Sequence, residues 1–492
     1  MKYKLIGIVM ALIMFFCALA AAAFEAGEGP HRVHQHLTAR QPYAVCDCDG
    51  TELCTHLPLV VINTNGQEIP GEVTKNYDKY GETIYTTADD GRSVIDVDIS
   101  IIDNQSRNNH PSDEPEVETI SELRLRGHSS RTFDKQSYLL NFVDEEGNGR
   151  DLPVMGMSAH SDWVLYGPSL DKTLVRNYMW YNIAGEIMEW APNVRYCEVI
   201  LNGEYQGLYL MMETITNGDD CRLDLTDVAY GTAVTGYLLR EDRSVETDVD
   251  GIRDVYSYIE RMLTIATDIE IRYPKKPNLS EELRKAIEQD FAAFEKTLYS
   301  YDYDTKDYGY WHYIDEQNFV DYYLINEFTL NVDAGYYSTY IYKDMSGKYK
   351  LAVWDFNNAC DNYIENETGY DVTGMSGRPL FFMLCKSDRF TDMILERYEE
   401  LRKTVFSDEY LLNYIDETLE YLGPAVERNN ERWKEVMTEW EPLEPVSRNL
   451  HSHEEAVEQL KDWLVNRGEW LDENFHAVKQ FSHDSRNKRY NH

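Results

Sequence analysis

Two aspartates, Asp333 and Asp355, are the residues whose positions in the sequence most strongly indicate chemistry. They flank a predicted hairpin in which STYIYK and KYKLAVWD are the strands and DMSG, residues 344–347, is the turn. Because the two open ends of a hairpin lie side by side, the carboxylates should converge although 22 residues separate them. Each stands just outside a strand, where a side chain can face a ligand while the scaffold stays rigid.

Convergent carboxylates have three common uses in proteins. They hold a divalent cation, or they act as acid and base on a glycosidic bond. In phosphoryl transfer, one carboxylate holds a metal ion and the other acts on the attacking hydroxyl. Protein kinases place a catalytic-loop aspartate beside an aspartate that holds magnesium. The first carboxylate orients the attacking hydroxyl or accepts its proton, and the second holds the metal that bridges the nucleotide phosphates. The alternative is that both aspartates only cap turns, as aspartate often does.

A basic segment with the sequence LRLRGHSSRTFDKQSYLLNF supplies groups that a nucleotide would need. Its first strand sends Arg124 and Arg126 to the same face. A turn of sequence GHSS then offers backbone N–H groups and hydroxyls, and Arg131 and Lys135 follow. These cations could bind phosphate oxygens, arginine as a fork and lysine as a point charge. They could equally form surface ion pairs, and the sequence contains neither a Walker A motif nor the glycine-rich loop of kinases.

The elements that must position these residues are strands in the first half of the chain and helices in the second. Apolar alternation predicts the strands, and the Asn202-Gly203 pair predicts a hairpin. Caps and helical periodicity predict the helices, the first capped by Ser169 or Asp171. The predicted strands cover residues 57–64, 92–103, 121–127, 137–143 and the hairpin 194–213, and the predicted helices cover about 170–189, 281–300, 315–330 and 454–475. The resulting fold class is α+β, with a strand-rich N-terminal part and a helical C-terminal part.

The chain divides into six segments by composition. Residues 1–23 have the basic start, apolar run and small-residue end of a secretory signal peptide, with an uncleaved membrane anchor as the alternative. With a cleaved signal peptide or an uncleaved anchor, the rest of the chain lies outside the cell. We therefore expect a secreted or surface-associated protein with no integral membrane span after signal cleavage. The predicted segments are the signal peptide (1–23), a polar linker (24–56), a β-rich segment (57–115), a core with both aspartates (116–377), a helical C-terminal part (378–480) and a polar tail (481–492).

The charge of the chain limits its partners. Lys and Arg number 47 against 87 Asp and Glu, so the formal net charge is −40. This charge disfavours nucleic acid, because each phosphate contact needs a lysine or arginine. It suits an extracellular protein that stays soluble by self-repulsion and attracts cations or basic polypeptides.

Three cysteines crowd the segment CDCDGTELC, residues 46–54. The cluster could hold a metal, but no fourth ligand stands at the spacing of a zinc site. His31, His34 and His36 are nearby in a polar stretch, where we expect them to be solvated. We therefore interpret this region as linker without a metal site.

The sequence resembles the spore-coat protein H (CotH) kinase family, whose members are secreted or coat-associated atypical protein kinases. Four blocks carry the resemblance from about residue 57 to residue 362: RGHSSRTFDKQSYLLNF, then DKTLVRN, then LNGEYQGLYLMMET, then NEFTLNVD with WDFNNACDN. The resemblance implies an atypical protein-kinase-like fold that lacks the usual glycine-rich loop. It further implies ATP-dependent phosphorylation of serine, with threonine as a second acceptor, in Ser-rich or basic proteins, and Mg²⁺ or Mn²⁺ as the metal.

The resemblance also assigns the two aspartates. Asp333 matches the catalytic-loop aspartate of the family and Asp355 matches its metal-binding aspartate. Kinase-like loops often present an asparagine five residues after the catalytic aspartate as a further metal ligand, and here that place is Ser338. Asn357 also stands where many relatives carry an acid. Because of these departures, the alternative to an active kinase is a catalytically inactive adhesin or scaffold that binds protein or glycan.

Five further residues are expected around ATP and its phosphates by the same resemblance. Lys135 falls in the basic segment expected near the phosphates, with Arg126 and Arg131 beside it. Arg176 matches the arginine of a family Arg-Asn pair on a helix, and Glu213 matches an acid at the end of a hairpin. A structural role is the alternative for Arg176 and Glu213.

Overall fold

The structure is a computed structural model that describes residues 32–37, 46–77, 83–127, 129–218, 222–227, 235–242, 251–252 and 268–483. The predicted signal peptide, the end of the predicted tail and His128 of the basic turn lie outside the described residues. In the described part of the chain, no helix combines the length and apolar character needed to cross a bilayer.

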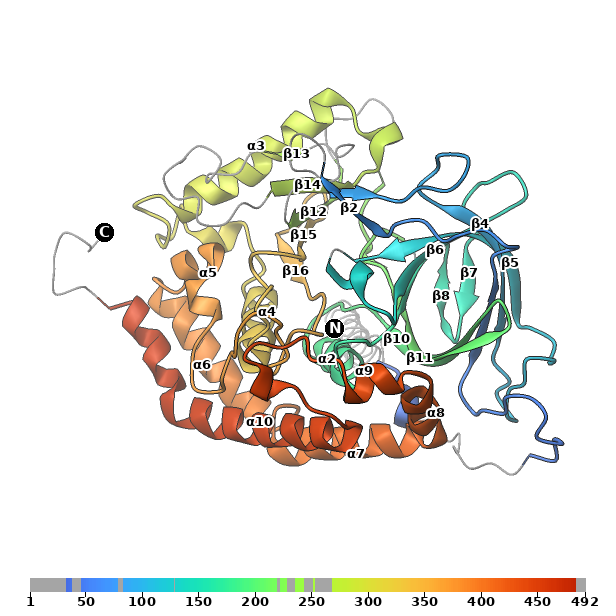
Figure 1. Ribbon diagram of the computed structural model, residues 1–492. Helices are drawn as coiled ribbons and strands as arrows, with labels where there is room; N and C mark the ends of the chain where they lie inside the picture. Colours follow the sequence, from blue (N-terminus) through green and yellow to red (C-terminus); the bar gives the residue numbers. More distant parts are fainter. Residues whose placement is uncertain are drawn as a thin grey trace, which may run out of the picture.

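A closed seven-stranded barrel forms the N-terminal half of the fold (Figure 1). Its order around the barrel is β1-β10-β11-β9-β6-β5-β4, and β1 with β10 is its parallel pair. Buried residues alternate with more exposed ones along β4 and β5, and the buried apolar residues of both strands belong to the core inside the barrel. The strands are β1 (Leu59–Asn63), β4 (Ile95–Ile102), β5 (Val117–Arg126), β6 (Ser137–Val143), β9 (Asp162–Tyr166), β10 (Val194–Leu201) and β11 (Glu204–Glu213).

The hairpin of β10 and β11 turns at Asn202 and Gly203, as the sequence predicts. Both residues have positive φ, 52° and 81°, which an Asn-Gly pair tolerates and a two-residue turn between twisted strands requires. The prediction of strands at β1, β4, β5 and β6 is likewise confirmed.

A second, five-stranded sheet contains the hairpin that carries the two aspartates. Its order is β13-β14-β12-β15-β16, and all of its pairs are antiparallel. Its strands are β12 (Tyr237–Asp242), β13 (Gly251–Ile252), β14 (Asp268–Tyr273), β15 (Thr339–Lys343) and β16 (Lys350–Ala352), and two small hairpins pair β2 (Val73–Tyr77) with β3 (Thr83–Tyr85) and β7 (Leu152–Val154) with β8 (Met157–His160).

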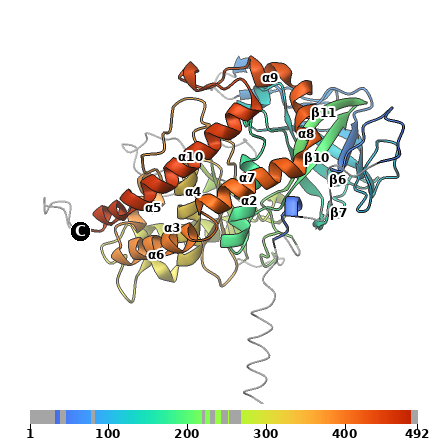
Figure 2. The same ribbon diagram turned by 90° about the horizontal axis from the view of Figure 1, so that it is seen from below.

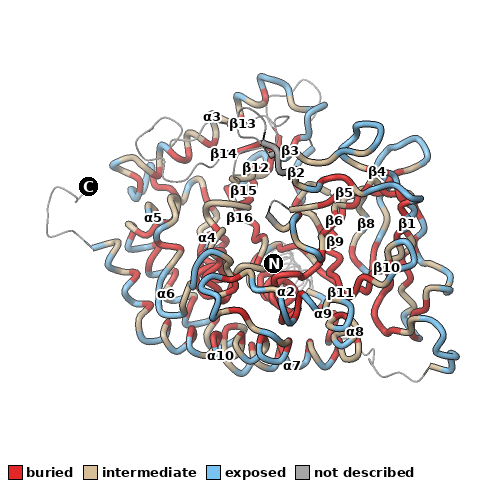
Figure 3. Tube along the Cα trace, viewed as in Figure 1, coloured by how far each residue is buried: buried red, intermediate tan, exposed pale blue. Residues whose placement is uncertain are grey.

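Helices make up most of the remaining half, with α2 between them and the barrel (Figures 1 and 2). Buried stretches concentrate along α2 and on the barrel strands (Figure 3). The α-helices are α2 (Arg176–Ile187), α3 (Glu281–Leu298), α4 (Glu316–Thr329), α5 (Pro379–Leu384), α6 (Asp388–Arg402), α7 (Asp408–Leu422), α8 (Pro424–Arg432), α9 (Lys434–Thr438) and α10 (His453–Asn474). Shorter 3₁₀ turns cover Gln35–Leu37, Ser129–Thr132, Lys276–Asn278, Tyr310–His312, Met375–Gly377, Val446–Arg448 and Phe475–Phe481.

The α+β class with a strand-rich N-terminal part and a helical C-terminal part is therefore confirmed, whereas a kinase-like arrangement is not. The closed barrel was not predicted. Its closure depends on the parallel pairing of β1 with β10, which joins strands more than 130 residues apart, and alternation within each strand does not reveal such a partner.

Two local predictions are wrong. The first helix begins at Arg176 rather than near residue 170, because the Asp171 carboxylate accepts the backbone N–H groups of Thr173 and Arg176 and holds a turn before the helix. His34 and His36 are buried, not solvated. Their ring nitrogens lie 2.9 Å from the hydroxyls of Tyr414 and Tyr178, so hydrogen bonds offset their burial.

Candidate active site

The hairpin of β15 and β16 brings Asp333 and Asp355 to its open end. α4 ends at Thr329, a loop then carries Asp333, and β15 pairs with β16 with Tyr340 opposite Ala352. Asp355 follows β16 by three residues. The predicted hairpin and its turn are thus confirmed.

Backbone strain concentrates in this segment. Nine described residues other than glycine have positive φ, and five of them lie between positions 330 and 361. They include Ser338 at 48° and Asp355 at 59°; the others are Leu330, Cys360 and Asp361. Left-handed conformations cost free energy for residues with a Cβ and persist where surrounding contacts enforce them, commonly at functional sites.

Helix α2 enforces the conformation of Asp355. The Asp355 N–H donates to the Tyr181 hydroxyl at 2.8 Å, and the next N–H, of Phe356, donates to Asn177 Oδ1 at 2.8 Å. From the other side, Asn331 Nδ2 donates to the Asp355 carbonyl at 3.1 Å. Because α2 and the loop after α4 both bond the backbone here, two elements fix the backbone conformation from which the Asp355 side chain projects.

The carboxyl of Asp355 has a strongly perturbed pKa. The pKa of Asp355 is raised from its ordinary value to about 6, mainly by burial and also by the negative charges of Asp333 and Asp242. The Arg126 cation and the N–H of Asn357 oppose the rise. Asp333, Asp355 and Arg126 therefore share one electrostatic environment, as the hairpin geometry led us to expect for the two aspartates.

Asn358 connects the two aspartates. Its Nδ2 donates to Asp333 Oδ2 at 2.8 Å, and it stands three residues after Asp355. The Asp333 carbonyl accepts the N–H groups of Tyr336 and Tyr337, which closes the loop before β15. The Asp333 carboxylate is thus oriented by the same loop that follows Asp355.

Arg126 ends β5 and faces this environment. Its guanidinium carbon lies 5.0 Å from the ring centroid of Trp354, the residue before Asp355. Arg124 lies on the same face of the strand, as predicted, since the two alternate with buried leucines. The barrel therefore contributes a cation to a site whose carboxylates come from the second sheet.

Sequence reasoning missed Asp242, the last residue of β12. β12 pairs with β15, with Glu241 opposite Thr339, so Asp242 lies beside the open end of the hairpin. No local signal identifies it, because its place depends on the pairing of two strands about 100 residues apart. Ser338, a predicted metal ligand, lies partly buried at the same open end.

Arg131 and Lys135 face internal partners. Arg131 donates to the carbonyls of Gly127 and Gly71 and stacks on Tyr85 at 4.1 Å. Lys135 Nζ donates to the Leu208 carbonyl at 2.7 Å and to an amide oxygen of α8 at 2.6 Å. Burial lowers the pKa of Lys135 well below its ordinary value. Both cations stabilise barrel contacts in this structure.

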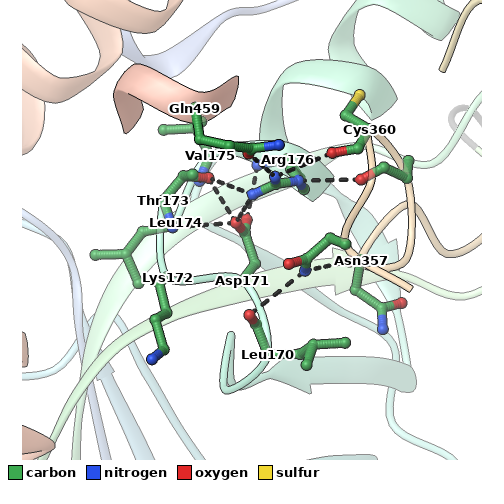
Figure 4. Close-up of polar contacts among 12 residues, drawn as sticks. Leu170, Asp171, Lys172, Thr173, Leu174, Val175, Arg176, Asn357, Cys360 and Gln459 are labelled. Carbon is green, nitrogen blue, oxygen red and sulfur yellow. Dashed lines mark hydrogen bonds and ion pairs between the residues drawn. The ribbon is translucent and has the colours of Figure 1, made fainter. Parts of the chain in front are cut away.

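Arg176 bonds three segments together (Figure 4). Its Nη1 lies 2.7 Å from the Asp171 carboxylate, its Nε and Nη2 donate to the carbonyls of Ala359 and Cys360, and its Nη2 also reaches Gln459 of α10 at 3.3 Å. The side chain is 3% exposed. Arg176 therefore holds the loop that follows Asp355 against α2 and α10.

Truncation of the Arg176 side chain should lower the stability of the folded protein. Arg176→Ala leaves the buried Asp171 carboxylate without its cation, so we expect the free energy of unfolding to fall by about 3–5 kcal/mol. Arg389→Ala is the control, because Arg389 is 59% exposed and its pair with Glu316 should contribute under about 1 kcal/mol. Urea denaturation of both variants measures the difference, and equal losses would contradict the assigned role.

Glu213 lies at the end of β11 and is fully buried. Its Oε2 accepts the backbone N–H of Asn193 at 2.7 Å and the side-chain amide at 3.0 Å. Burial raises the pKa of Glu213, while the charges of Arg222 and Arg32 lower it. The contacts of Glu213 thus join β11 to the segment before β10, and its predicted role near ATP stays a prediction.

Two cavities lie beside the loops that carry the aspartates. One, of about 220 Å³, is lined by Leu330, Asn331 and Val332 with residues 372–375 and Arg378. The other, of about 230 Å³, is lined by Arg176, Asp361 and Asn362 with residues of the C-terminal part. Among the described residues, Asp333 and Asp355 line neither cavity, but both cavities contact the segments that position them.

The donor set fits a hard divalent cation. Asp333 and Asp355 offer carboxylate oxygens whose mutual repulsion a cation would offset, and Mg²⁺ is commonly held by one or two carboxylates. Asn357 Oδ1 is buried without a hydrogen-bond partner among the described residues. Two carboxylates and an unpartnered amide oxygen next to them are suitable ligands for Mg²⁺ or Mn²⁺.

Comparison with known proteins agrees with the sequence resemblance. No curated protein matched the chain. A family model described as CotH kinase protein matches residues 123–471, which cover most of the chain and include Arg126, Asp333 and Asp355. The chain therefore belongs to the CotH kinase protein family.

Proposed function

We propose that this protein is a secreted or surface-associated atypical kinase that transfers the γ-phosphate of ATP to serine, with threonine as a second acceptor, in protein substrates. Membership of the CotH kinase family suggests a kinase-like activity. The observation that carries the proposal is the convergence of Asp333 and Asp355 at the open end of the β15–β16 hairpin, where the charges of Asp333 and Arg126 both act on the buried Asp355 carboxyl. Perturbed carboxyls that face a like charge and a cation are typical of catalytic sites.

Asp355 would hold the metal, with Asp333 and Ser338 as further candidate ligands. A bound Mg²⁺ or Mn²⁺ would neutralise charge on the phosphates of ATP. The backbone of Asp355 is held by Tyr181 and Asn331, and the N–H of Asn357 bonds its carboxylate. Asn357 adds an amide oxygen and a backbone N–H to the same loop.

Asp333 would orient the acceptor hydroxyl and accept its proton. The hydroxyl oxygen attacks the γ-phosphorus, the bond to the bridging oxygen of ADP breaks, and the proton passes to the Asp333 carboxylate. Asn358 orients this carboxylate through a hydrogen bond of 2.8 Å. The cavity of about 220 Å³ beside residues 330–332 offers a place for the acceptor chain.

Arg126 is the phosphate-binding residue of this proposal. It is the cation that acts on Asp355, whereas Arg131, Lys135 and Arg176 have internal partners and would position the loops and strands. A guanidinium bonds phosphate oxygens as a planar fork. Glu213 would support the barrel through its contacts with Asn193.

Removal of the Arg126 cation should weaken ATP binding. Charge-assisted hydrogen bonds contribute about 1.5–3 kcal/mol, so we expect Arg126→Ala to raise the KM for ATP by about 10–100-fold. The pKa of Asp355 should also rise above about 6, since Arg126 lowers it. Arg92→Ala is the control, because Arg92 pairs with Asp90 and Asp96 on an exposed turn. Steady-state kinetics with varied ATP measure the effect, and an unchanged KM would remove Arg126 from the phosphate site.

The proposal is tested by phosphate transfer with the full chain. The protein is incubated with ATP, Mg²⁺ or Mn²⁺, and Ser-rich or basic peptides, and phosphorylated residues are located by mass spectrometry. Phosphoserine on the chain itself or on the peptides supports the kinase. Absence of nucleotide binding in calorimetry, together with tight binding of protein or glycan, would instead establish an inactive adhesin or scaffold.

A further inference from the structure

Four side chains with metal-binding atoms meet at the start of the described barrel. Cys46, Cys48 and Cys54 converge with His110, and their sulfur and ring nitrogen atoms all lie within 4.8 Å of one another. His110 comes 56 residues after the last of these cysteines, on the connection between β4 and β5. The fourth ligand that sequence spacing did not supply is thus supplied by the fold.

The spacing of these atoms suits one tetrahedral ion. Cys46 Sγ lies 3.5 Å from His110 Nε2. In a tetrahedral site with Zn–S of about 2.3 Å and Zn–N of about 2.0–2.1 Å, the sulfur-to-nitrogen edge is about 3.6 Å. An upper limit of 4.8 Å on every pair leaves room for a single ion among the four atoms.

The histidine is oriented as metal-binding histidines are. His110 Nδ1 lies 3.3 Å from Asp113 Oδ2, so Nε2 is the nitrogen that faces the sulfurs. Asp113 is itself fixed, since it accepts the His110 N–H at 2.9 Å and pairs with Arg107 at 2.9 Å. A carboxylate behind a ligating histidine fixes the ring and raises its basicity.

The sulfurs also receive N–H donors. Asn108 Nδ2 donates to Cys54 Sγ at 3.2 Å, and the backbone N–H of Gly50 hydrogen-bonds the sulfur of Cys48. Such donors stabilise thiolates, and thiolate is the form that binds metal. Two of the three sulfurs thus have an N–H donor directed at the atom that would bind the metal.

The backbone holds the two segments together without the metal ligands. Thr55 and Asn109 exchange both backbone hydrogen bonds, at 3.1 and 2.7 Å, and Asn109 Nδ2 donates to the Leu57 carbonyl at 2.8 Å. Ser112 also donates to the Glu52 carboxylate at 2.6 Å. The convergence of the four ligands therefore rests on a continuous set of contacts.

We propose that Cys46, Cys48, Cys54 and His110 form a structural Zn²⁺ site. Three thiolates and one imidazole are ligands that Zn²⁺ prefers over hard cations such as Mg²⁺. All four positions are filled by the protein, which is the pattern of structural rather than catalytic zinc. This site is separate in its residues and in its ligand chemistry from the oxygen donors around Asp355.

The site would join the N-terminal segment to both halves of the molecule. Thr55 Oγ1 accepts from Arg428 of α8 at 3.3 Å, and the His56 ring packs edge-on against Tyr421 of α7 with centroids 5.1 Å apart. Residues that follow the cluster thus contact the helical part, while His110 belongs to the barrel. Loss of the ion should loosen these contacts and lower the Tm.

Zinc content is the first test. The full chain is purified without chelator under anaerobic conditions. Elemental mass spectrometry should then find one Zn²⁺ per chain. Cys48→Ser, at an exposed position, should reduce the zinc content to about one-tenth or less. His451→Ala should retain it, because His451 is exposed and bonds the Thr438 carbonyl elsewhere. Asp113→Asn should weaken Zn²⁺ affinity by about 10–100-fold through the orientation of His110.

Cobalt gives a readout that does not depend on any variant folding. Co²⁺ added to the metal-free wild-type chain should produce intense visible bands of a tetrahedral ion and sulfur-to-cobalt charge-transfer bands, and Zn²⁺ should abolish them. A chain without zinc and without these bands would overturn the proposal. A disulfide among Cys46, Cys48 and Cys54 in the freshly isolated chain, detected by mass spectrometry without reduction, would also overturn it.

Discussion

Asp355→Asn should lower phosphate transfer by at least about 10³-fold and at the same time stabilise the metal-free protein at neutral pH. The loss of activity follows from the proposed role of Asp355, because metal-based charge stabilisation contributes several kcal/mol to a transition state and each 1.36 kcal/mol is tenfold in rate. The gain in stability follows from the environment of the carboxylate, which burial and two like charges make unfavourable when ionised.

The direction of the stability effect can be derived from the pKa. Folding raises the pKa of Asp355 from an ordinary value near 3.8 to about 6, so the folded state holds its proton more tightly than the unfolded state. Ionisation therefore costs nothing below about pH 4, and its full cost of about 2–3 kcal/mol is present above about pH 6. Asparagine cannot ionise, so the advantage of the variant should appear as pH rises through this range and vanish at pH 4.

Urea denaturation between pH 4 and 8, without added divalent cations, measures this difference. Mn²⁺ should then stabilise the wild-type protein more than the variant, because ligand bound to the folded state adds to its stability. Asp344→Asn is the matched control, since Asp344 lies at the closed end of the same hairpin and bonds the Thr226 N–H. An Asp355→Asn protein that is active, or one whose stability tracks wild type at every pH, would contradict the assignment.

The convergence of Asp333 and Asp355 could be predicted because every signal for it is local. Alternation identifies β15 and β16, the turn residues identify the connection, and hairpin geometry alone brings the open ends together. The β10–β11 hairpin was predictable for the same reason, from Asn202 and Gly203. In both cases the residues that decide the geometry lie within one supersecondary unit.

Contacts between distant segments could not be predicted in this way. A basic residue that follows a strand gives the same local signal whether it faces a phosphate or a carbonyl oxygen. Lys135 is occupied by Asn429, 294 residues later, and Asp242 joins the site only because β12 pairs with β15. His110 likewise becomes a fourth potential ligand of the cysteine cluster only through the bridge between Thr55 and Asn109. Each of these outcomes is decided by tertiary packing.

Asp333→Asn should separate the two roles of the aspartates. If Asp333 accepts the proton of the acceptor hydroxyl, kcat should fall by about 10²–10⁴-fold, while the Kd for ATP changes only a few-fold. Asn358 can still bond the amide oxygen at position 333, so the loop should keep its shape. Asp304→Asn, at an exposed acidic residue in the segment between α3 and α4, is the control for the loss of one negative charge.

Asp333→Asn should also change the pKa of Asp355. No such change is expected if Asp333 only stabilises a turn. The negative charge of Asp333 raises the pKa of Asp355, so its removal should move that pKa below about 6. The pH at which Mn²⁺ binding is half lost should therefore move to lower pH in Asp333→Asn, because fewer protons compete with the metal. A fall in kcat without this shift would place Asp333 outside the electrostatic environment of Asp355. A shift without a fall in kcat would leave Asp333 as a neighbour of the metal ligand that takes no part in the transfer of the proton.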